Sequence, residues 1–84
     1  MFYYTYILKS EKDGKLYTGS TKDLRKRLNQ HNKGLSTHTK GRGPFNLIYY
    51  EACLSREKAG SRELFLKSGM GKRYLKNRLG ASYL

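Results

Sequence analysis

A short turn between two strand-like runs at the start of the chain constrains the fold more than any other feature. Residues 2–9 (Phe-Tyr-Tyr-Thr-Tyr-Ile-Leu-Lys) are rich in aromatic and β-branched side chains, which favour strands. The turn contains Asp13-Gly14, a typical hairpin signal, and residues 15–19 return as a second strand. Because so short a connection joins antiparallel neighbours, Tyr6 and Tyr17 could lie on adjacent strands. Strand alternation puts Phe2, Tyr4, Tyr6 and Leu8 on one face, and Tyr3, Thr5 and Ile7 on the other.

A helix is predicted over residues 21–32, directly after the second strand. Ser20 is its expected N-cap, with Asp23 three residues later as a negative charge in the first turn. Gly34 follows the helix as a typical stop. Two pairs of residues spaced four apart define its faces: Leu24 with Leu28 towards a core, and Arg27 with His31 on an adjacent stripe. This stretch could build part of a site, or it could be an ordinary basic helix packed by two leucines.

The middle of the chain is predicted to be a loop followed by a third strand. Residues 35–44 hold almost nothing apolar, so we expect a mobile loop with Lys40 and Arg42 at its tip and His38 in solvent. Residues 45–53 follow as a strand, and their near-continuous apolar content favours the middle of the sheet. Cys53 is expected to be a small buried hydrophobe.

Two more helices complete the pattern. Ser55 should cap the first, over residues 56–68, and Gly60 inside it suggests close packing. A glycine-rich break at 69–71 precedes a short helix over 72–80, with Leu75 and Leu79 facing inward. The order strand-strand-helix-strand-helix-helix predicts an α/β (α+β) fold, a small three-stranded antiparallel sheet flanked by about three helices. We expect one domain over residues 1–84, with its core over about 3–78.

Charge indicates the class of partner. The 84 residues carry 18 Lys and Arg against six Asp and Glu, a net charge of +12, and residues 22–42 hold seven of the basic side chains and one acid. Such a surface binds polyanions, and a phosphate backbone is the commonest one, so DNA is the expected partner and RNA a less favoured one. The single cysteine, Cys53, excludes an internal disulfide, and no Cys/His cluster has zinc-ligand spacing. The absence of a long apolar run predicts a cytoplasmic protein with no membrane partner.

Glu63 occupies an unusual position in the second of the three helices. Ala59, Arg62, Glu63 and Leu66 follow the i, i+3, i+4, i+7 spacing of a packing face. A carboxylate on a half-apolar face requires a partner, a metal ion or a water-filled cleft.

Taken in order, these features resemble the GIY-YIG nuclease superfamily, and most closely its small stand-alone bacterial branch. The Tyr-x-Gly signature stands as Tyr17-Thr18-Gly19, and of the first signature, Gly-Ile-Tyr, only Tyr6 is kept. Arg27 matches the motif arginine on the helix, and His31 matches a position one turn later that is commonly His or Tyr. Glu63 aligns with the metal-binding glutamate. The resemblance covers nearly the whole chain.

The resemblance implies a catalytic set for phosphodiester hydrolysis: Tyr6, Tyr17, Arg27, His31 and Glu63. Tyr6, or less favourably Tyr17, would be the general base, although a free tyrosine with a pKa of about 10 needs nearby positive charge to act at pH 7. Arg27 would bind the scissile phosphate through its planar fork. His31 would protonate the leaving group or orient a tyrosine. Glu63 would hold a single Mg²⁺ or Mn²⁺ together with waters and the phosphate.

Basic side chains and one glycine are expected to contact nucleic acid: Lys9, Gly19, Lys22, Arg25, Lys26, Lys40, Arg42 and Lys67. Gly19 would permit close approach of the DNA. Lys67 matches a basic residue that often follows the metal-binding glutamate. Lys9 resembles a lysine that assists the tyrosine base in some relatives, but alternation puts Lys9 on the opposite strand face from Tyr6 unless the strand bulges.

The leading hypothesis is a metal-dependent DNA endonuclease that prefers branched or damaged DNA, recognised by shape or through an unknown recruiting protein. One alternative is a non-catalytic module that holds DNA or RNA on the same basic face. A second alternative, suggested by size and charge alone, is a structural protein associated with ribosomes or RNA.

Overall fold

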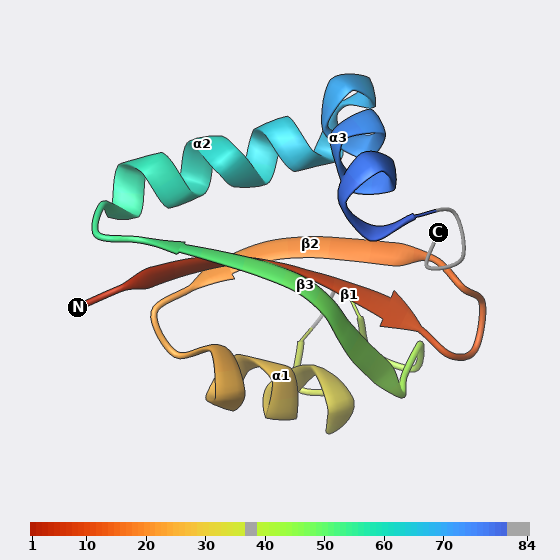
Figure 1. Cartoon of the computed structure of the whole chain (residues 1–84). Coiled ribbons are helices and arrows are strands. Elements are labelled where there is room, and N and C mark those ends of the chain that lie inside the picture. The colour runs from red at the N-terminus through yellow and green to blue at the C-terminus, as the bar shows by residue number, and fades with distance from the viewer. Residues whose placement is uncertain (37–38, 81–84) are drawn as a thin grey trace.

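The computed structural model describes residues 1–36 and 39–80, and it has the predicted element order. The elements follow one another along the chain as β1 (Tyr3–Ser10), β2 (Leu16–Thr21), α1 (Leu24–Asn32), β3 (Phe45–Cys53), α2 (Arg56–Lys67) and α3 (Gly69–Leu79). The three strands form one antiparallel sheet in the order β2-β1-β3. Figure 1 shows α1 on one face of this sheet and α2 with α3 on the other. None of the helices in the described ranges has the length and apolarity that a membrane span needs.

The alternation of β1 divides the core into two layers. Tyr6 and Leu8 pack with Phe45 on the α1 side, and Ile7 packs with Leu66 and Leu75 on the side of α2 and α3. Thr5 lies on that second side, where its hydroxyl donates a hydrogen bond to the Ala59 carbonyl oxygen of α2 at 2.9 Å. The central strand therefore presents its odd and even side chains to two different helical layers, as alternation predicted.

The expectation that the third strand lies in the middle of the sheet is wrong, because β3 is an edge strand and β1 is central. The apolar content of β3 has another cause: helices contact it from both sides, α1 on one face and α2 on the other. The pairing of β1 with β3 slips by one residue, since Ile7 lies opposite Tyr49 but Leu8 lies opposite Leu47. The extra residue belongs to β3, so the alternation of β1 continues and Lys9 keeps the parity of Ile7.

The helix starts show two further corrections. Asp23, rather than Ser20, is the N-cap of α1, and its carboxylate accepts a hydrogen bond from the Lys26 backbone N–H at 3.1 Å. Ser20 belongs to β2, which continues to Thr21 by pairing with β1. Ser55 caps α2 as predicted. The third helix starts at Gly69, earlier than expected, because Ser68 caps it and accepts from the Gly71 N–H at 3.2 Å.

Close packing occurs at a different glycine from the one expected. A Cβ on Gly60 would meet no atom within 4 Å, so that prediction is wrong. A Cβ on Gly71 would collide with the Phe65 carbonyl oxygen and lie 2.5 Å from the Leu66 Cα. Gly71 therefore lets α3 turn directly against the end of α2. Cys53 is half-buried rather than buried, and its thiol donates to the Ser55 carbonyl oxygen at 3.2 Å.

Residues 33–36 and 39–44, the described part of the segment between α1 and β3, form no helix or strand, as predicted, and hydrogen bonds tie them to the sheet. Ser10 donates from Oγ to the Arg42 carbonyl oxygen at 2.6 Å, and the Glu11 N–H donates to the Pro44 carbonyl oxygen at 2.9 Å. Thr39 is buried within this segment. The expected solvent position of His38 lies outside the described residues.

Candidate active site

Gly19 allows the Tyr6 ring to reach the outer edge of the sheet. Tyr6 on β1 lies directly opposite Gly19 on β2, which is the edge strand. A Cβ on Gly19 would collide with the Tyr6 hydroxyl and lie 2.6 Å from its Cζ. The Tyr6 ring on the neighbouring strand therefore leaves no room for a side chain at the glycine of the Tyr-x-Gly motif. This holds whether or not DNA approaches Gly19.

The Tyr6 hydroxyl joins two side chains of α1. Tyr6 Oη lies 2.9 Å from His31 Nε2, and Arg27 Nε donates a longer hydrogen bond to it at 3.4 Å. Tyr6 is only 3% exposed. Burial raises the pKa of Tyr6 above its usual value, and the Arg27 guanidinium opposes part of that rise. Tyr6 is therefore a neutral phenol at pH 7.

His31 is held from its other side by a residue of the loop. Its Nδ1 lies 2.7 Å from Thr39 Oγ1, and both residues are buried. Burial lowers the pKa of His31 below its usual value, and the nearby Arg27 charge lowers it further. The ring is therefore neutral at pH 7 and carries one N–H. If that proton is on Nδ1 and donated to Thr39, Nε2 is an acceptor for the Tyr6 hydroxyl proton.

Glu63 approaches from the opposite face of the sheet. Ser20 Oγ donates to Glu63 Oε1 at 2.9 Å, and Lys67 Nζ pairs with Oε2 at 2.9 Å one turn along α2. The Glu63 side chain is 24% exposed. Mg²⁺ is commonly bound by one or two carboxylates and keeps several waters, so one half-buried carboxylate at an open cleft fits such an ion. The Lys67 ammonium group already pairs with this carboxylate and would compete with a metal ion for it.

One open cleft of about 750 Å³ brings all five proposed catalytic residues together around the edge strand β2. Arg27 and His31 approach it from α1 on one face of the sheet, and Glu63 approaches from α2 on the other (Figure 1). Tyr17 on β2 packs edge-on against Phe45 with ring centroids 5.4 Å apart. Among the described residues lining the cleft, Glu63 carries the one carboxylate.

The proposed nucleic-acid contacts divide into two groups. Gly19, Arg42 and Lys67 line the cleft with the catalytic set. The remaining basic residues do not line it: Lys9, Lys22, Arg25, Lys26 and Lys40. Lys22 and Arg25 line a separate hollow near the start of α1, and Lys26 and Lys40 are exposed. Lys9, at the parity of Ile7 on β1, is not placed beside Tyr6.

Sequence reasoning missed two side chains that touch the proposed set. Ser20 was assigned to helix capping, although its place beside Gly19 at the end of a strand was a usable signal. Thr39 lies eight residues after His31 in an irregular segment, and no spacing rule connects the two. Two further lysines, Lys15 and Lys72, line the cleft and add to its positive charge.

Comparisons with known proteins identify the family. The model of the GIY-YIG catalytic domain matches residues 2–78. A UPF0213 protein of Clostridium perfringens is 48% identical over 65 residues, which cover 76% of this chain and 69% of that protein. One from Staphylococcus saprophyticus is 41% identical over 75 residues, covering 88% and 90% of the two chains.

A solved structure supports the same assignment. The solution structure of a UPF0213 protein from Bacillus halodurans matches with a TM-score of 0.58 and 38% identity, covering 99% of this chain and 90% of that one. The chain therefore belongs to the GIY-YIG nuclease superfamily and is similar to its small UPF0213 proteins.

Proposed function

We propose that this protein is a divalent-metal-dependent endonuclease that hydrolyses phosphodiester bonds in DNA. The observation that carries the proposal is the Tyr6 hydroxyl, which contacts both His31 and Arg27 in the cleft that also holds Glu63. Hydrolysis needs an acceptor for the proton of the attacking water, positive charge at the phosphoryl oxygens and a carboxylate for the metal ion. The cleft offers a group for each role: the Tyr6–His31 pair, several cations that include Arg27, and the Glu63 carboxylate.

Tyr6 and His31 together provide a route for the proton of the attacking water. As the water attacks phosphorus, its proton passes to Tyr6 Oη, and the original Tyr6 proton passes to His31 Nε2. This relay leaves Tyr6 neutral throughout, which suits a buried phenol with a raised pKa. It requires a neutral His31, which suits an imidazole with a lowered pKa. The imidazolium that results returns its extra proton to solvent by way of Tyr6 after the bond has broken, and the leaving 3′-oxygen takes its proton from water, because both ring nitrogens of His31 face protein partners.

Three other side chains act on the phosphate and the metal ion. Arg27 binds a non-bridging phosphoryl oxygen and offsets the charge that develops there. Glu63 would hold the Mg²⁺ or Mn²⁺, and Ser20 orients its carboxylate through a 2.9 Å hydrogen bond. The bound ion would supply Lewis-acid stabilisation of the developing negative charge. Lys67, which pairs with Glu63 here, would then be available to bind the phosphate backbone.

A second function is favoured by the Glu63–Lys67 ion pair. Its 2.9 Å contact already neutralises the carboxylate, as expected of a non-catalytic module that holds DNA or RNA on the basic face. For the nuclease function, we further propose that the protein acts in the cytoplasm as one domain, on DNA rather than RNA and without a membrane partner.

A cleavage assay separates the two functions. Flap, forked, nicked and linear DNAs are incubated with wild type and Glu63→Gln in Mg²⁺, Mn²⁺ or EDTA. We expect wild type to nick at least one branched DNA with metal only, and Glu63→Gln to lose at least about 100-fold in rate while still binding. Glu57→Gln, on the exposed first turn of α2, is the matched control. Binding with no metal-dependent cleavage of any DNA would favour the non-catalytic module. The expected loss of about 100-fold in the rate of Glu63→Gln follows from removing a residue that is needed in the transition state.

A further inference from the structure

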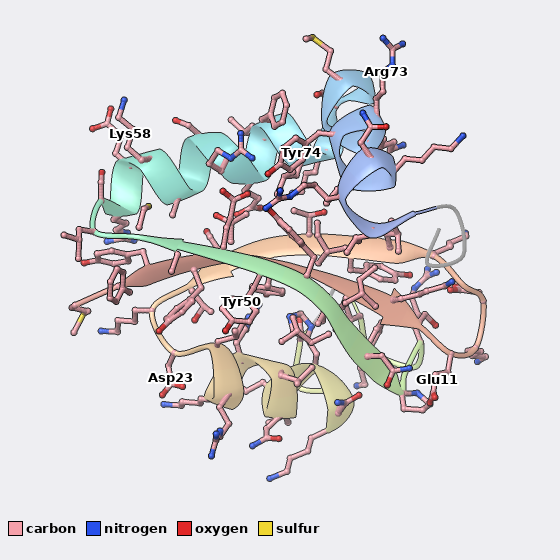
Figure 2. All side chains as sticks on the ribbon, in the orientation of Figure 1. Glu11, Asp23, Tyr50, Lys58, Arg73 and Tyr74 are labelled. Carbon is pink, nitrogen blue, oxygen red and sulfur yellow. The ribbon has the colours of Figure 1, made fainter. Side chains whose placement is uncertain are left out.

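A second hollow lies at the start of α1, on the same face of the sheet as Tyr6. We name it the aromatic pocket, and it has a volume of about 450 Å³, lined by Tyr4, Lys22, Asp23, Leu24, Arg25, Leu28, Leu47 and Tyr50. Pockets of this volume hold small organic groups. Figure 2 shows Tyr50 on the α1 side of the sheet, close to the start of α1 where Asp23 lies. The pocket shares no lining residue with the candidate active site.

Tyr50 gives the aromatic pocket an open aromatic wall. Its ring packs edge-on to Tyr4, with centroids 5.9 Å apart, yet Tyr50 remains 53% exposed. Leucines of α1 and β3 form the apolar lining. Packing within the fold therefore uses one side of the tyrosine pair and leaves ring surface accessible.

Two cations and one carboxylate line the pocket, so its net charge is positive. Lys22 and Arg25 line it and are exposed, and the carboxylate of Asp23 is already engaged with the Lys26 backbone N–H. An apolar aromatic surface bounded by cations matches one nucleotide, whose base is flat and whose phosphate is anionic. Base stacking on aromatic rings beside cationic groups is a general mode of binding single strands.

A small cleft borders both the aromatic pocket and the candidate active site. This cleft of about 320 Å³ shares Ser20 with the active-site cleft and Lys22 with the aromatic pocket, and Arg56 adds a second cation. Ser20 and Lys22 are two residues apart, at most about 7 Å along an extended chain. A strand carries a phosphate about every 3.4 Å along the axis of duplex DNA, so the rims of the two hollows at Ser20 and Lys22 lie within a few nucleotides of each other.

We propose that the aromatic pocket binds an unpaired nucleobase of the DNA strand whose backbone enters the candidate active site. Paired bases are stacked inside the duplex and cannot present a face to Tyr50, so the pocket selects DNA with an unpaired nucleotide beside the cut. This inference rests on the proposed function for its orientation along the strand. It gives a physical reason for a preference for branched DNA, because a flap or fork supplies the unpaired base that a continuous duplex lacks.

Binding measured in EDTA tests the pocket without relying on cleavage. Fluorescence anisotropy gives the Kd of full-length protein for a single strand, a duplex and a flap, over a series of salt concentrations. Tyr50→Val removes the ring and puts a residue of high strand propensity in its place, whereas Tyr50→Phe keeps the ring. Leu64→Ala, at a still more exposed apolar position on α2, is the control. Circular dichroism verifies that each variant is folded.

The proposal predicts a distinct result for each variant. Tyr50→Val weakens single-strand and flap binding roughly 5- to 100-fold, as expected for one lost stacking contact, and leaves duplex binding and the salt slope unchanged. Tyr50→Phe and Leu64→Ala bind as wild type does. Lys22→Ala instead weakens all three DNAs and reduces the salt slope by roughly one phosphate contact.

Other outcomes overturn the proposal. Equal weakening of duplex and single-strand binding by Tyr50→Val would show that the pocket does not select unpaired bases. A concentration-dependent dimer in sedimentation that Tyr50→Val abolishes would assign the surface to a second copy of the chain. Failure of the proposed nuclease function is separate, because wild type would then keep the Tyr50-dependent preference in EDTA but cut nothing in Mg²⁺ or Mn²⁺.

Discussion

The Tyr6 hydroxyl lies 2.9 Å from His31 Nε2 inside the protein and joins the central strand to the last turn of α1. Neither group is charged at pH 7, since burial raises the pKa of Tyr6 and lowers the pKa of His31. The Arg27 charge lowers both pKa values, so it opposes the effect of burial at Tyr6, where it makes the phenol a stronger acid, and adds to the effect of burial at His31, where it helps to keep the ring neutral. The proposed activity depends on His31 remaining neutral.

The pH dependence of cleavage should therefore be set by His31 on the acidic side. Because the His31 pKa lies below its usual value of 6.5, the rate should rise with pH below 6.5 and level off from there to about pH 9. Single-turnover rates between pH 5 and pH 9 test this expectation. His31→Gln should be slower and lose the acidic limb. An unchanged limb in His31→Gln would assign it to another group.

Stability should depend on the same residue. Where the pH falls below 6.5, the unfolded chain binds a proton on His31 before the folded protein does. The contribution of neutral His31 is thus fully present above pH 6.5 and is lost as pH falls through the lowered pKa. Urea unfolding at pH 7.5 and pH 5 should show a smaller free-energy loss for His31→Gln than for wild type. Equal losses would contradict this assignment.

Thr39 should act through His31 rather than on the substrate. Thr39→Val keeps the shape but removes the hydroxyl, leaving His31 Nδ1 without its 2.7 Å partner, at a cost of about 1–3 kcal/mol in unfolding free energy. Thr39→Ser keeps the hydroxyl and should retain cleavage. Nitrogen NMR shifts of His31 report its tautomer, and we expect Thr39→Val alone to alter it. Equal cleavage rates for the two variants would remove Thr39 from the mechanism.

Two glycines should respond to alanine in opposite directions. Gly19→Ala places a methyl group against the Tyr6 ring, which should cost about 1–3 kcal/mol and displace Tyr6 from its contacts with His31 and Arg27. Gly60→Ala meets no atom within 4 Å and should stabilise α2 by up to about 1 kcal/mol. Thermal unfolding and cleavage rates give both results. Wild-type stability and activity in Gly19→Ala would contradict the contact.

Lys67 should compete with a metal ion for Glu63. Lys67→Met removes the cation paired with Glu63 Oε2 while keeping an unbranched side chain. Mn²⁺ affinity, followed by water-proton relaxation, should then rise at least about twofold, because even exposed pairs at this spacing contribute about 0.3–0.5 kcal/mol. Glu63→Gln should abolish the same signal. Weaker Mn²⁺ binding in Lys67→Met would show that Lys67 supports the metal site.

The sequence determined the elements of this fold because their signals are local. Alternation along β1 predicted that Tyr6 and Ile7 face different layers, and the two residues belong to different core clusters. Hairpin chemistry at Asp13-Gly14 predicted the pairing of β1 with β2, which is the pairing observed. The stripe on α2 predicted that Glu63 faces inward, and its side chain is half-buried.

Choices between equivalent residues required the tertiary structure. Ser20 and Asp23 can both cap a helix, and the pairing of Ser20 with Thr5 across the sheet leaves the cap to Asp23. Gly60 and Gly71 both lie in helices, and the sharp turn from α2 into α3 determines that only Gly71 is closely packed. The edge position of β3 likewise depends on β1 pairing on both of its sides.

The sequence by itself determined which residue types are present, their order and the strand or helix face each occupies. The tertiary structure alone decided that they meet around one edge strand, because β2 has a free side where α1 and α2 approach from opposite faces. Thr39 shows the reason most clearly. Its hydrogen bond to His31 depends on the path of an irregular segment, and no periodicity encodes such a path.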